Sequence, residues 1–199
     1  MTGLCHPLTI RYRMVKDLDR NDWLRAARMA LLKSGVDAVR VERLARTLQV
    51  TKGSFYWHFK NREQLLEALL REWEEERSMV SDLLGQRDMR AALAKLFAEL
   101  GHRVRASERG ELPSDAAIFA WAAVSPKVAM RVNNEEKARI RLLKKVFRQN
   151  EAAEYVYMAY LGFLLRRRRV PEAAKNFPIL AKLSTALLLN SAANPLTPR

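Results

Sequence analysis

The fold is decided by the stretch from Val41 to Gln64, which reads VERLARTLQVTKGSFYWHFKNREQ. Its first part predicts a short helix that buries Leu44 and Leu48 on one face. A second short helix begins near Thr51, after a turn of only a few residues. Two short helices joined in this way form a helix-turn-helix, whose second helix enters the major groove of DNA. The stretch therefore predicts a DNA-binding motif.

The second helix of the motif carries the residues that would contact DNA. Phe55 and Phe59 lie one turn apart and anchor the helix, which leaves its other side free. Gly53 has no side chain, so the backbone can approach a base edge, and Lys52 can reach guanine acceptors or phosphate. A purely structural helical corner is the alternative. An exposed Tyr-Trp-His face beside Lys52 is a poor surface for such a corner, because no partner would cover it.

The residues before the motif predict an arm followed by a helix. Residues 1–20 have weak periodicity and form a flexible basic arm, which either reaches into a minor groove or stays idle. The helix that follows has Asp22 as its N-cap and ends at Gly35. The basic residues of the arm are Arg11, Arg13 and Lys16.

The residues after the motif also predict helices. Asn61 and Gln64 form a capping-box arrangement at the start of a helix that continues through Trp73. We place a domain boundary inside this helix, between residues 21–70 and residues 71–199. No run of residues alternates as a strand does, so the predicted fold class is all-α.

The composition narrows the classes of function. The chain has 199 residues, 49% of them hydrophobic, and a formal net charge of +14. This surplus points to a polyanion, either nucleic acid or an anionic membrane. The one cysteine excludes an intrachain disulfide and a cysteine-based zinc site, and it favours the cytoplasm. No apolar run is long enough to span a membrane, and the glycines form neither a GxGxxG turn nor a P-loop, so no cofactor is predicted.

The segment from Asp22 to Leu70 resembles the DNA-binding region of the TetR family of bacterial transcriptional regulators. The likeness is most specific in VTKGSFYWHFKNRE, residues 50–63, and it includes the helix end at Gly35 and the Leu44-Ala45 pair. The resemblance implies a three-helix DNA-binding domain at residues 21–70. It also implies an all-helical ligand-binding and dimerisation domain at residues 71–199.

The resemblance implies that Lys52 and Gly53 face base edges, while the other contacts are mainly to the DNA backbone. Two positions depart from the family pattern. Val39 stands where the second helix usually starts with Thr or Ser, so Arg40 is expected to supply that contact. Gln49 stands where glycine is common, and we expect the turn to adapt rather than to strain Gln49 at a positive φ. The predicted DNA-binding residues are Arg40, Thr51, Lys52, Gly53, Ser54, Tyr56, Trp57, His58 and Lys60.

Two helices near the end of the chain predict a homodimer. Residues 151–169 and 177–191 are apolar over much of their circumference, and small residues permit a close approach of helices. This pattern favours a four-helix bundle with a twofold mate over burial within one subunit. The predicted interface is Tyr155, Ala159, Gly162, Phe163, Leu180, Leu183 and Leu187.

The large apolar residues of the middle helices predict a cavity for an apolar or aromatic small molecule. For any one of these residues, ordinary core packing is the alternative. The predicted lining is Phe97, Phe119, Trp121, Met130, Phe147, Tyr157 and Met158.

The predicted function is a transcriptional regulator, in the simplest case a repressor, that binds a palindromic operator as a dimer and is released by a ligand. A ligand-independent helical DNA-binding protein is one alternative. A metal-containing helical-bundle enzyme is the other, but it rests only on the i, i+3 spacing of Glu99 and His102. We therefore predict no catalytic and no metal-binding residue. The four arginines at 166–169 spread around a helix end and predict no second nucleic-acid patch.

Overall fold

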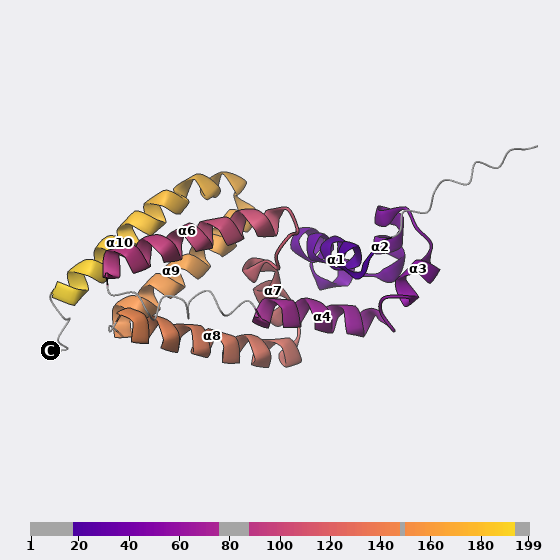
Figure 1. The fold of residues 1–199 in the computed structure, drawn as a ribbon, viewed down its shortest axis with the longest axis horizontal. Helices are drawn as coiled ribbons and strands as arrows, with labels where there is room; N and C mark the ends of the chain where they lie inside the picture. Colours follow the sequence, from indigo (N-terminus) through magenta and orange to yellow (C-terminus); the bar gives the residue numbers. More distant parts are fainter. Residues whose placement is uncertain (1–17, 76–87, 148–149, 194–199) are drawn as a thin grey trace, which may run out of the picture.

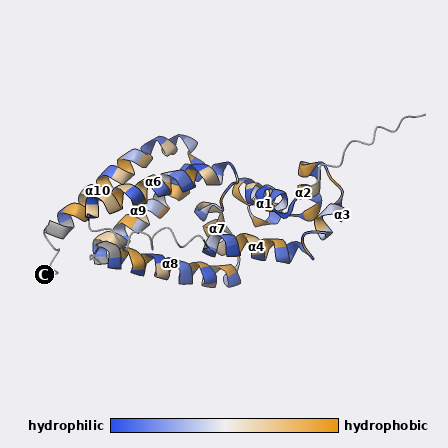
Figure 2. Ribbon diagram, viewed as in Figure 1, coloured by the Kyte–Doolittle hydropathy of each residue, from blue (hydrophilic) through white to orange (hydrophobic). Residues whose placement is uncertain are grey.

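The computed structural model describes residues 18–75, 88–147 and 150–193. Every regular element in these ranges is a helix, and the helices form an elongated molecule (Figure 1). The predicted all-α class is confirmed. Hydrophobic and hydrophilic residues alternate around most of the helices, as expected of amphipathic helices with one buried side (Figure 2). The basic residues of the predicted arm lie outside the described residues.

The N-terminal helices lie at one end of the molecule (Figure 1). They are α1 (Arg20–Ser34), the 3-10 helix η1 (Val36–Ala38), α2 (Val41–Leu48), α3 (Lys52–Tyr56) and α4 (Arg62–Glu75). The predicted N-cap of α1 is wrong by one turn. Asp19 is the cap and accepts a hydrogen bond from the Asp22 amide at 2.8 Å, while the Asp22 carboxylate accepts one from the Asp19 amide at 3.1 Å. Both carboxylates thus form a capping box at the N-terminus of α1.

Aromatic packing fixes α3 on the rest of this domain. Phe55 and Phe59 are buried and their rings stack at 5.5 Å, while Trp23 of α1 meets Phe55 edge-on at 5.2 Å. Val39 is also completely buried, so the departure from the family pattern at this position serves the core. The two predicted anchors of the recognition helix are therefore confirmed.

The start of α4 is tied to the preceding chain by three side chains. Asn61 accepts from the Gln64 amide at 2.9 Å, and Gln64 reaches back to the Lys60 amide at 2.5 Å, one residue before the group expected in a capping box. Arg62 donates to the carbonyl oxygens of Val39 and Val36 at 2.6 and 2.8 Å. The arginine therefore holds the entry to α2 against α4.

Gln49 ends α2 with φ of 60° and ψ of 39°, which is the left-handed region. The expectation that the turn would adapt is wrong. The amide of Gln49 and that of Val50 still bond to carbonyl oxygens of α2, at 3.2 and 3.0 Å. These bonds close the helix in the same way as a C-terminal glycine does, so the turn keeps its geometry at the expense of Gln49.

We expect Gln49→Gly to stabilise the domain by about 0.5–1 kcal/mol, because glycine takes a positive φ without the Cβ clash. Urea denaturation measures the difference. The matched control is Arg46→Gly, an exposed position of α2 with ordinary helical geometry, which should lose about 1 kcal/mol. Equal losses for both variants would contradict the strain assigned to Gln49.

The remaining helices form the rest of the molecule. They are α6 (Met89–Glu108), α7 (Asp115–Ala122), α8 (Pro126–Phe147), α9 (Asn150–Arg169), the 3-10 helix η2 (Pro171–Asn176) and α10 (Phe177–Ala193). The short α7 lies between the N-terminal helices and the C-terminal helices (Figure 1). Its residues Ile118 and Trp121, with Val132 of α8, belong to the same buried cluster as the core of α1 to α4. Because the apolar core continues past residue 70, the division there stays a prediction.

Candidate nucleic-acid interface

The recognition helix α3 exposes the side that the sequence assigns to DNA. Trp57 is 88% exposed and Tyr56 is 60% exposed. Phe55, directly before them, and Phe59, shortly after them, are buried. Trp57 therefore does not pack into the core. A large aromatic surface next to basic residues is unfavourable in water unless a partner covers it.

All nine residues predicted to contact DNA lie at least partly on the surface. Ser54 and His58 are half-buried, and the other seven are exposed: Arg40, Thr51, Lys52, Gly53, Tyr56, Trp57 and Lys60. Thr51 takes the N-cap position of α3, but its side chain makes no capping hydrogen bond. Its hydroxyl thus remains available to another acceptor or donor. Arg40 is held in place by a 2.9 Å hydrogen bond from its Nε to the Asp37 carbonyl oxygen.

Gly53 is not needed by the fold itself. An added Cβ would meet only the Thr51 hydroxyl oxygen, at 3.5 Å, which is an ordinary contact. The space beside the backbone of α3 is therefore open. A duplex can use this space for a close approach, which is the role that the sequence predicts for Gly53.

One acidic residue that is not among the predicted DNA-binding residues also lies on this surface. Glu42 of α2 forms an ion pair with Lys52, with 2.9 Å between Glu42 Oε1 and Lys52 Nζ. Both side chains are more than half exposed. The hydrogen bond from Lys52 lowers the pKa of the Glu42 carboxyl below its ordinary value. Glu42 therefore stays ionised and competes with any base or phosphate for Lys52.

We expect Glu42→Gln to raise DNA affinity several-fold at low salt, because the change removes a negative charge and releases Lys52 toward the duplex. Fluorescence anisotropy with a labelled duplex measures the effect. Glu172→Gln, an exposed residue of η2, serves as the control for net charge. If both variants gain equally, the effect comes from overall charge and not from the pair with Lys52.

Residues 24–69, which span this surface, match the family model described as bacterial regulatory proteins, tetR family. Over these residues the chain is similar to the DNA-binding region of the TetR family. The TetC protein of transposon Tn10 from Escherichia coli is 44% identical over 43 residues, a match that spans 22% of this chain and 22% of that relative's own length. This likeness is thus confined to about a fifth of either chain.

Solved structures resemble this chain over most of its length, including the C-terminal helices. The fatty acid degradation regulator FadR from Bacillus halodurans has a TM-score of 0.65 at 16% identity, over 90% of this chain and 97% of its own. A complex of SmeT with triclosan has a TM-score of 0.61 at 20% identity, over 84% and 90% of the two chains. NalD, the secondary repressor of the MexAB-OprM multidrug efflux pump in Pseudomonas aeruginosa, has a TM-score of 0.56 at 19% identity, over 83% and 92%. These TM-scores establish a shared fold.

The predicted dimer residues divide between surface and core. Tyr155 of α9 and Leu183 of α10 are 60% and 64% exposed. Gly162 is exposed, while Ala159, Leu180 and Leu187 are half-buried. Phe163 is a correction, since it is buried within the subunit and its ring lies 5.4 Å from that of Phe177. Three more apolar residues on these two helices are exposed and were not assigned to the interface: Met158, Leu165 and Ile179.

The predicted ligand-lining residues do not surround one cavity. Phe97 and Tyr157 lie in a buried cluster of α6, α8, α9 and α10. Trp121 and Phe119 belong instead to the cluster that contains the core of α1 to α4. The prediction that Met130 and Met158 line a cavity is wrong, because they face outward and are 61% and 57% exposed. The side chain of Phe147 lies outside the described residues. The prediction relied on the apolar character and helical spacing of these residues. The rotation of α8 and α9 about their axes places Met130 and Met158 on the outside.

The features set aside in the sequence occupy ordinary places. The Glu99 carboxylate and the His102 ring nitrogen are 4.0 Å apart on the surface of α6. Within the described ranges, no three His, Cys, Asp or Glu residues gather as metal ligands. No helix in those ranges is both long enough and apolar enough to cross a bilayer. Arg167, in the last turn of α9, forms an ion pair with Glu108.

Proposed function

We propose that this TetR-family chain is a repressor that binds an inverted-repeat operator as a homodimer and leaves it when a small molecule binds. The observation that carries the DNA-binding part is the exposed side of α3, where Lys52, Tyr56 and Trp57 project beside buried phenylalanines. Two such helices, one from each subunit, would enter major grooves about 34–36 Å apart.

The apolar faces of α9 and α10 support the dimer. Leu183 and Ile179 on α10 and Tyr155, Met158 and Leu165 on α9 are each more than half exposed. Aromatic and aliphatic side chains gathered on neighbouring helices are typical of an interface with a second copy. A dimer also supplies the twofold symmetry that an inverted repeat requires.

Contacts at the far end of α4 support a route from ligand to DNA. Arg131 of α8 makes bidentate hydrogen bonds to Glu74 at 2.6 and 2.7 Å and reaches Glu67 at 2.8 Å. α4 follows the recognition helix α3 in the chain after a connection of residues 57–61. A ligand that prefers another arrangement of the C-terminal helices would therefore move α4 and change the separation of the two recognition helices. The ligand must bind the DNA-incompetent state more tightly to have this effect.

The test is selection of bound duplexes from a random-sequence library by the purified full chain. An inverted repeat in the selected sequences supports the proposal, as does a steep loss of affinity with added salt. Selection of a single unrepeated half-site would contradict the dimer on DNA. Failure to enrich any sequence would overturn specific DNA binding.

Lys52→Ala should weaken binding to the selected duplex by about 1–3 kcal/mol if Lys52 reads a base. Anisotropy titrations on the selected duplex and on scrambled duplexes measure the loss of affinity and of preference. Lys95→Ala, an exposed lysine of α6, is the matched control and should leave both unchanged. An equal loss on all duplexes would show that Lys52 contacts only phosphate.

A further inference from the structure

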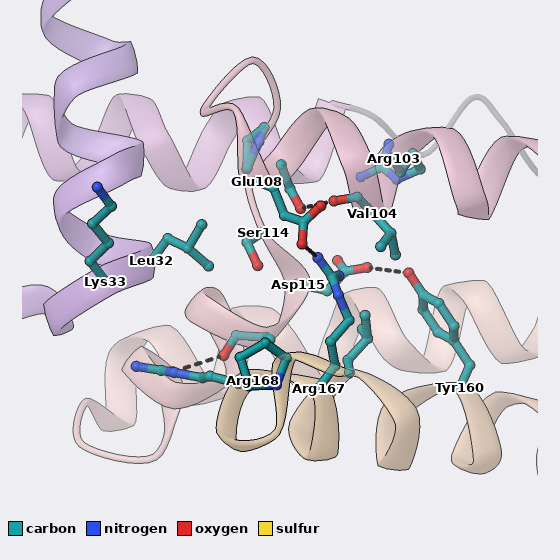
Figure 3. Close-up of a pocket in the computed structure, with 15 residues that line it drawn as sticks. Leu32, Lys33, Arg103, Val104, Glu108, Ser114, Asp115, Tyr160, Arg167 and Arg168 are labelled. Carbon is teal, nitrogen blue, oxygen red and sulfur yellow. Dashed lines mark hydrogen bonds and ion pairs between the residues drawn. The ribbon is translucent and has the colours of Figure 1, made fainter. Parts of the chain in front are cut away.

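A pocket of about 310 Å³ opens between the DNA-binding helices and the C-terminal helices (Figure 3). Leu32 and Lys33 of α1 line one side, Ser114 and Asp115 lie at the start of α7, and Arg168 approaches from α9. The volume is at the lower end of the range for small-molecule sites. None of the residues predicted from the sequence to line a ligand cavity is among those that line this pocket.

The lining carries an excess of positive charge. Its two carboxylates are already neutralised, because Glu108 pairs with Arg167, and Asp115 pairs with Arg139 at 3.1 Å. Asp115 also accepts a hydrogen bond from the Tyr160 hydroxyl at 3.3 Å. The cationic lining residues are Lys33, Arg103, Arg167 and Arg168. Four cations against two carboxylates leave a net charge of +2 around the cavity.

Two of the cations are available to a ligand. Lys33 is exposed, and none of the acidic residues that the structure describes forms an ion pair with it. Arg168 makes one long hydrogen bond, 3.4 Å, to the Ala116 carbonyl oxygen (Figure 3). Both side chains are flexible and line the same cavity, so they can turn toward one anion. A charged donor binds a carboxylate more strongly than it binds a backbone carbonyl.

Part of the remaining wall of the pocket is apolar. Val104 of α6 and Leu164 of α9 are buried members of one apolar cluster, and Pro113 and Pro171 complete the wall. An inorganic anion would leave this surface uncovered. A molecule with an anionic group and a hydrocarbon body would cover both kinds of wall.

We propose that this pocket binds a small organic carboxylate and is the effector site of the regulator, an inference that rests on the proposed function. The carboxylate lies between Lys33 and Arg168, and its hydrocarbon part contacts Val104 and Leu164. This ligand class adds an anionic group to the apolar or aromatic small molecule expected from the sequence.

The position of the pocket connects its occupant to the DNA-binding surface. Lys33 belongs to α1, and Trp23 of the same helix packs on Phe55 of the recognition helix at 5.2 Å. Arg168 belongs to α9. A carboxylate held by both cations thus favours one separation of α1 and α9. An operator that requires another separation binds more weakly while the ligand is present.

The experiment compares carboxylates with their neutral amides by isothermal titration of the full chain. The probes are hexanoate and benzoate, hexanamide and benzamide, and inorganic phosphate. The test variant is Lys33→Met with Arg168→Met, which keeps apolar stems and removes both charges. The matched control is Lys95→Met with Arg141→Met, an exposed lysine and an exposed arginine outside the pocket lining.

We expect at least one carboxylate to bind wild type and the control, with its amide and the test variant about tenfold weaker or more. Equal binding of amide and carboxylate, unchanged binding by the test variant, or binding of phosphate alone would each overturn the inference. So would the absence of carboxylate binding by a folded protein.

A second measurement separates this inference from the proposed function. The bound carboxylate should lower the affinity of wild type for the selected duplex and leave that of the test variant unchanged. If the carboxylate binds in the pocket without changing DNA affinity, the effector role is overturned. If the selected duplex binds normally and no carboxylate does, the pocket assignment fails while operator binding stands.

Discussion

Asp115→Asn is expected to destabilise the protein by about 3–5 kcal/mol, because it leaves a buried guanidinium without its counter-charge. Asp115 is 8% exposed at the start of α7. Its Oδ1 accepts from Trp73 Nε1 at 2.5 Å and from Arg139 at 3.1 Å. The Arg139 guanidinium in turn lies 4.6 Å from the Trp73 ring centroid. The carboxylate therefore joins α4, α7 and α8, and its loss affects the contact between the two halves of the molecule.

Urea denaturation at neutral pH measures this loss, and Asp88→Asn is the matched control. Asp88 caps α6 through a 2.8 Å hydrogen bond from the Arg90 amide, and asparagine caps a helix equally well. The control should therefore change stability by less than about 0.5 kcal/mol. A loss below about 1 kcal/mol in Asp115→Asn would show that the buried ion pair does not stabilise the junction.

The same carboxylate predicts a dependence of stability on pH. Burial alone raises the pKa of Asp115, but the charges of Arg139 and Arg103 outweigh it and hold the pKa below the ordinary value of 3.8. A carboxyl with a lowered folded-state pKa stabilises the protein above its unfolded pKa, and this contribution is lost as the pH falls through the folded value. The acid limb of the stability profile should accordingly be shallower in Asp115→Asn than in wild type.

The second large effect is expected for Leu183→Arg, which should convert the proposed dimer to monomers and lower affinity for an inverted-repeat duplex by about a hundredfold or more. Leu183 is 64% exposed on α10, a helix that packs against α9. A guanidinium at this position would have to lose its hydration in the interface without a partner. Monomers would then bind each half-site separately and lose the advantage of a linked pair.

Sedimentation equilibrium and anisotropy on the selected duplex measure the two consequences of this change. Val124→Arg is the matched control, because Val124 is 71% exposed and lies on neither α9 nor α10. It should remain dimeric and bind as wild type does. A monomeric wild type, or a Leu183→Arg variant that stays dimeric, would overturn the interface assigned to α9 and α10.

The recognition helix could be predicted closely because its geometry is local. Phe55 and Phe59 are four residues apart and both are buried, although α3 ends at Tyr56, so the turn after the helix also places Phe59. Lys52 and Tyr56 of α3 and Trp57 directly after it are exposed. Gln49 shows where local reasoning ended. The hydrogen bonds that close α2 hold the backbone of Gln49 in the left-handed region, although glutamine, unlike glycine, has a Cβ. The sequence alone does not show that the turn keeps this conformation.

The C-terminal half could be predicted in kind and not in detail. α9 is apolar around much of its circumference, so its sequence lacks the contrast that shows which side faces inward. Phe163 turned inward toward Phe177, and Met158 turned outward, because the packing of α9 against its neighbours sets the rotation of the helix. One residue predicted for the interface is therefore buried, and two residues predicted to line a cavity are exposed.

By itself the sequence determined the helical class, the motif from Val41 to Phe59 and the side of α3 that remains free, since each depends on contacts between residues a few positions apart. Tertiary structure alone decided the junction around Asp115, whose partners Trp73 and Arg139 lie 42 and 24 residues away in the chain. It also decided that the open pocket is cationic. A charged residue in a sequence shows its sign, but whether another charge neutralises it depends on which distant helix packs beside it.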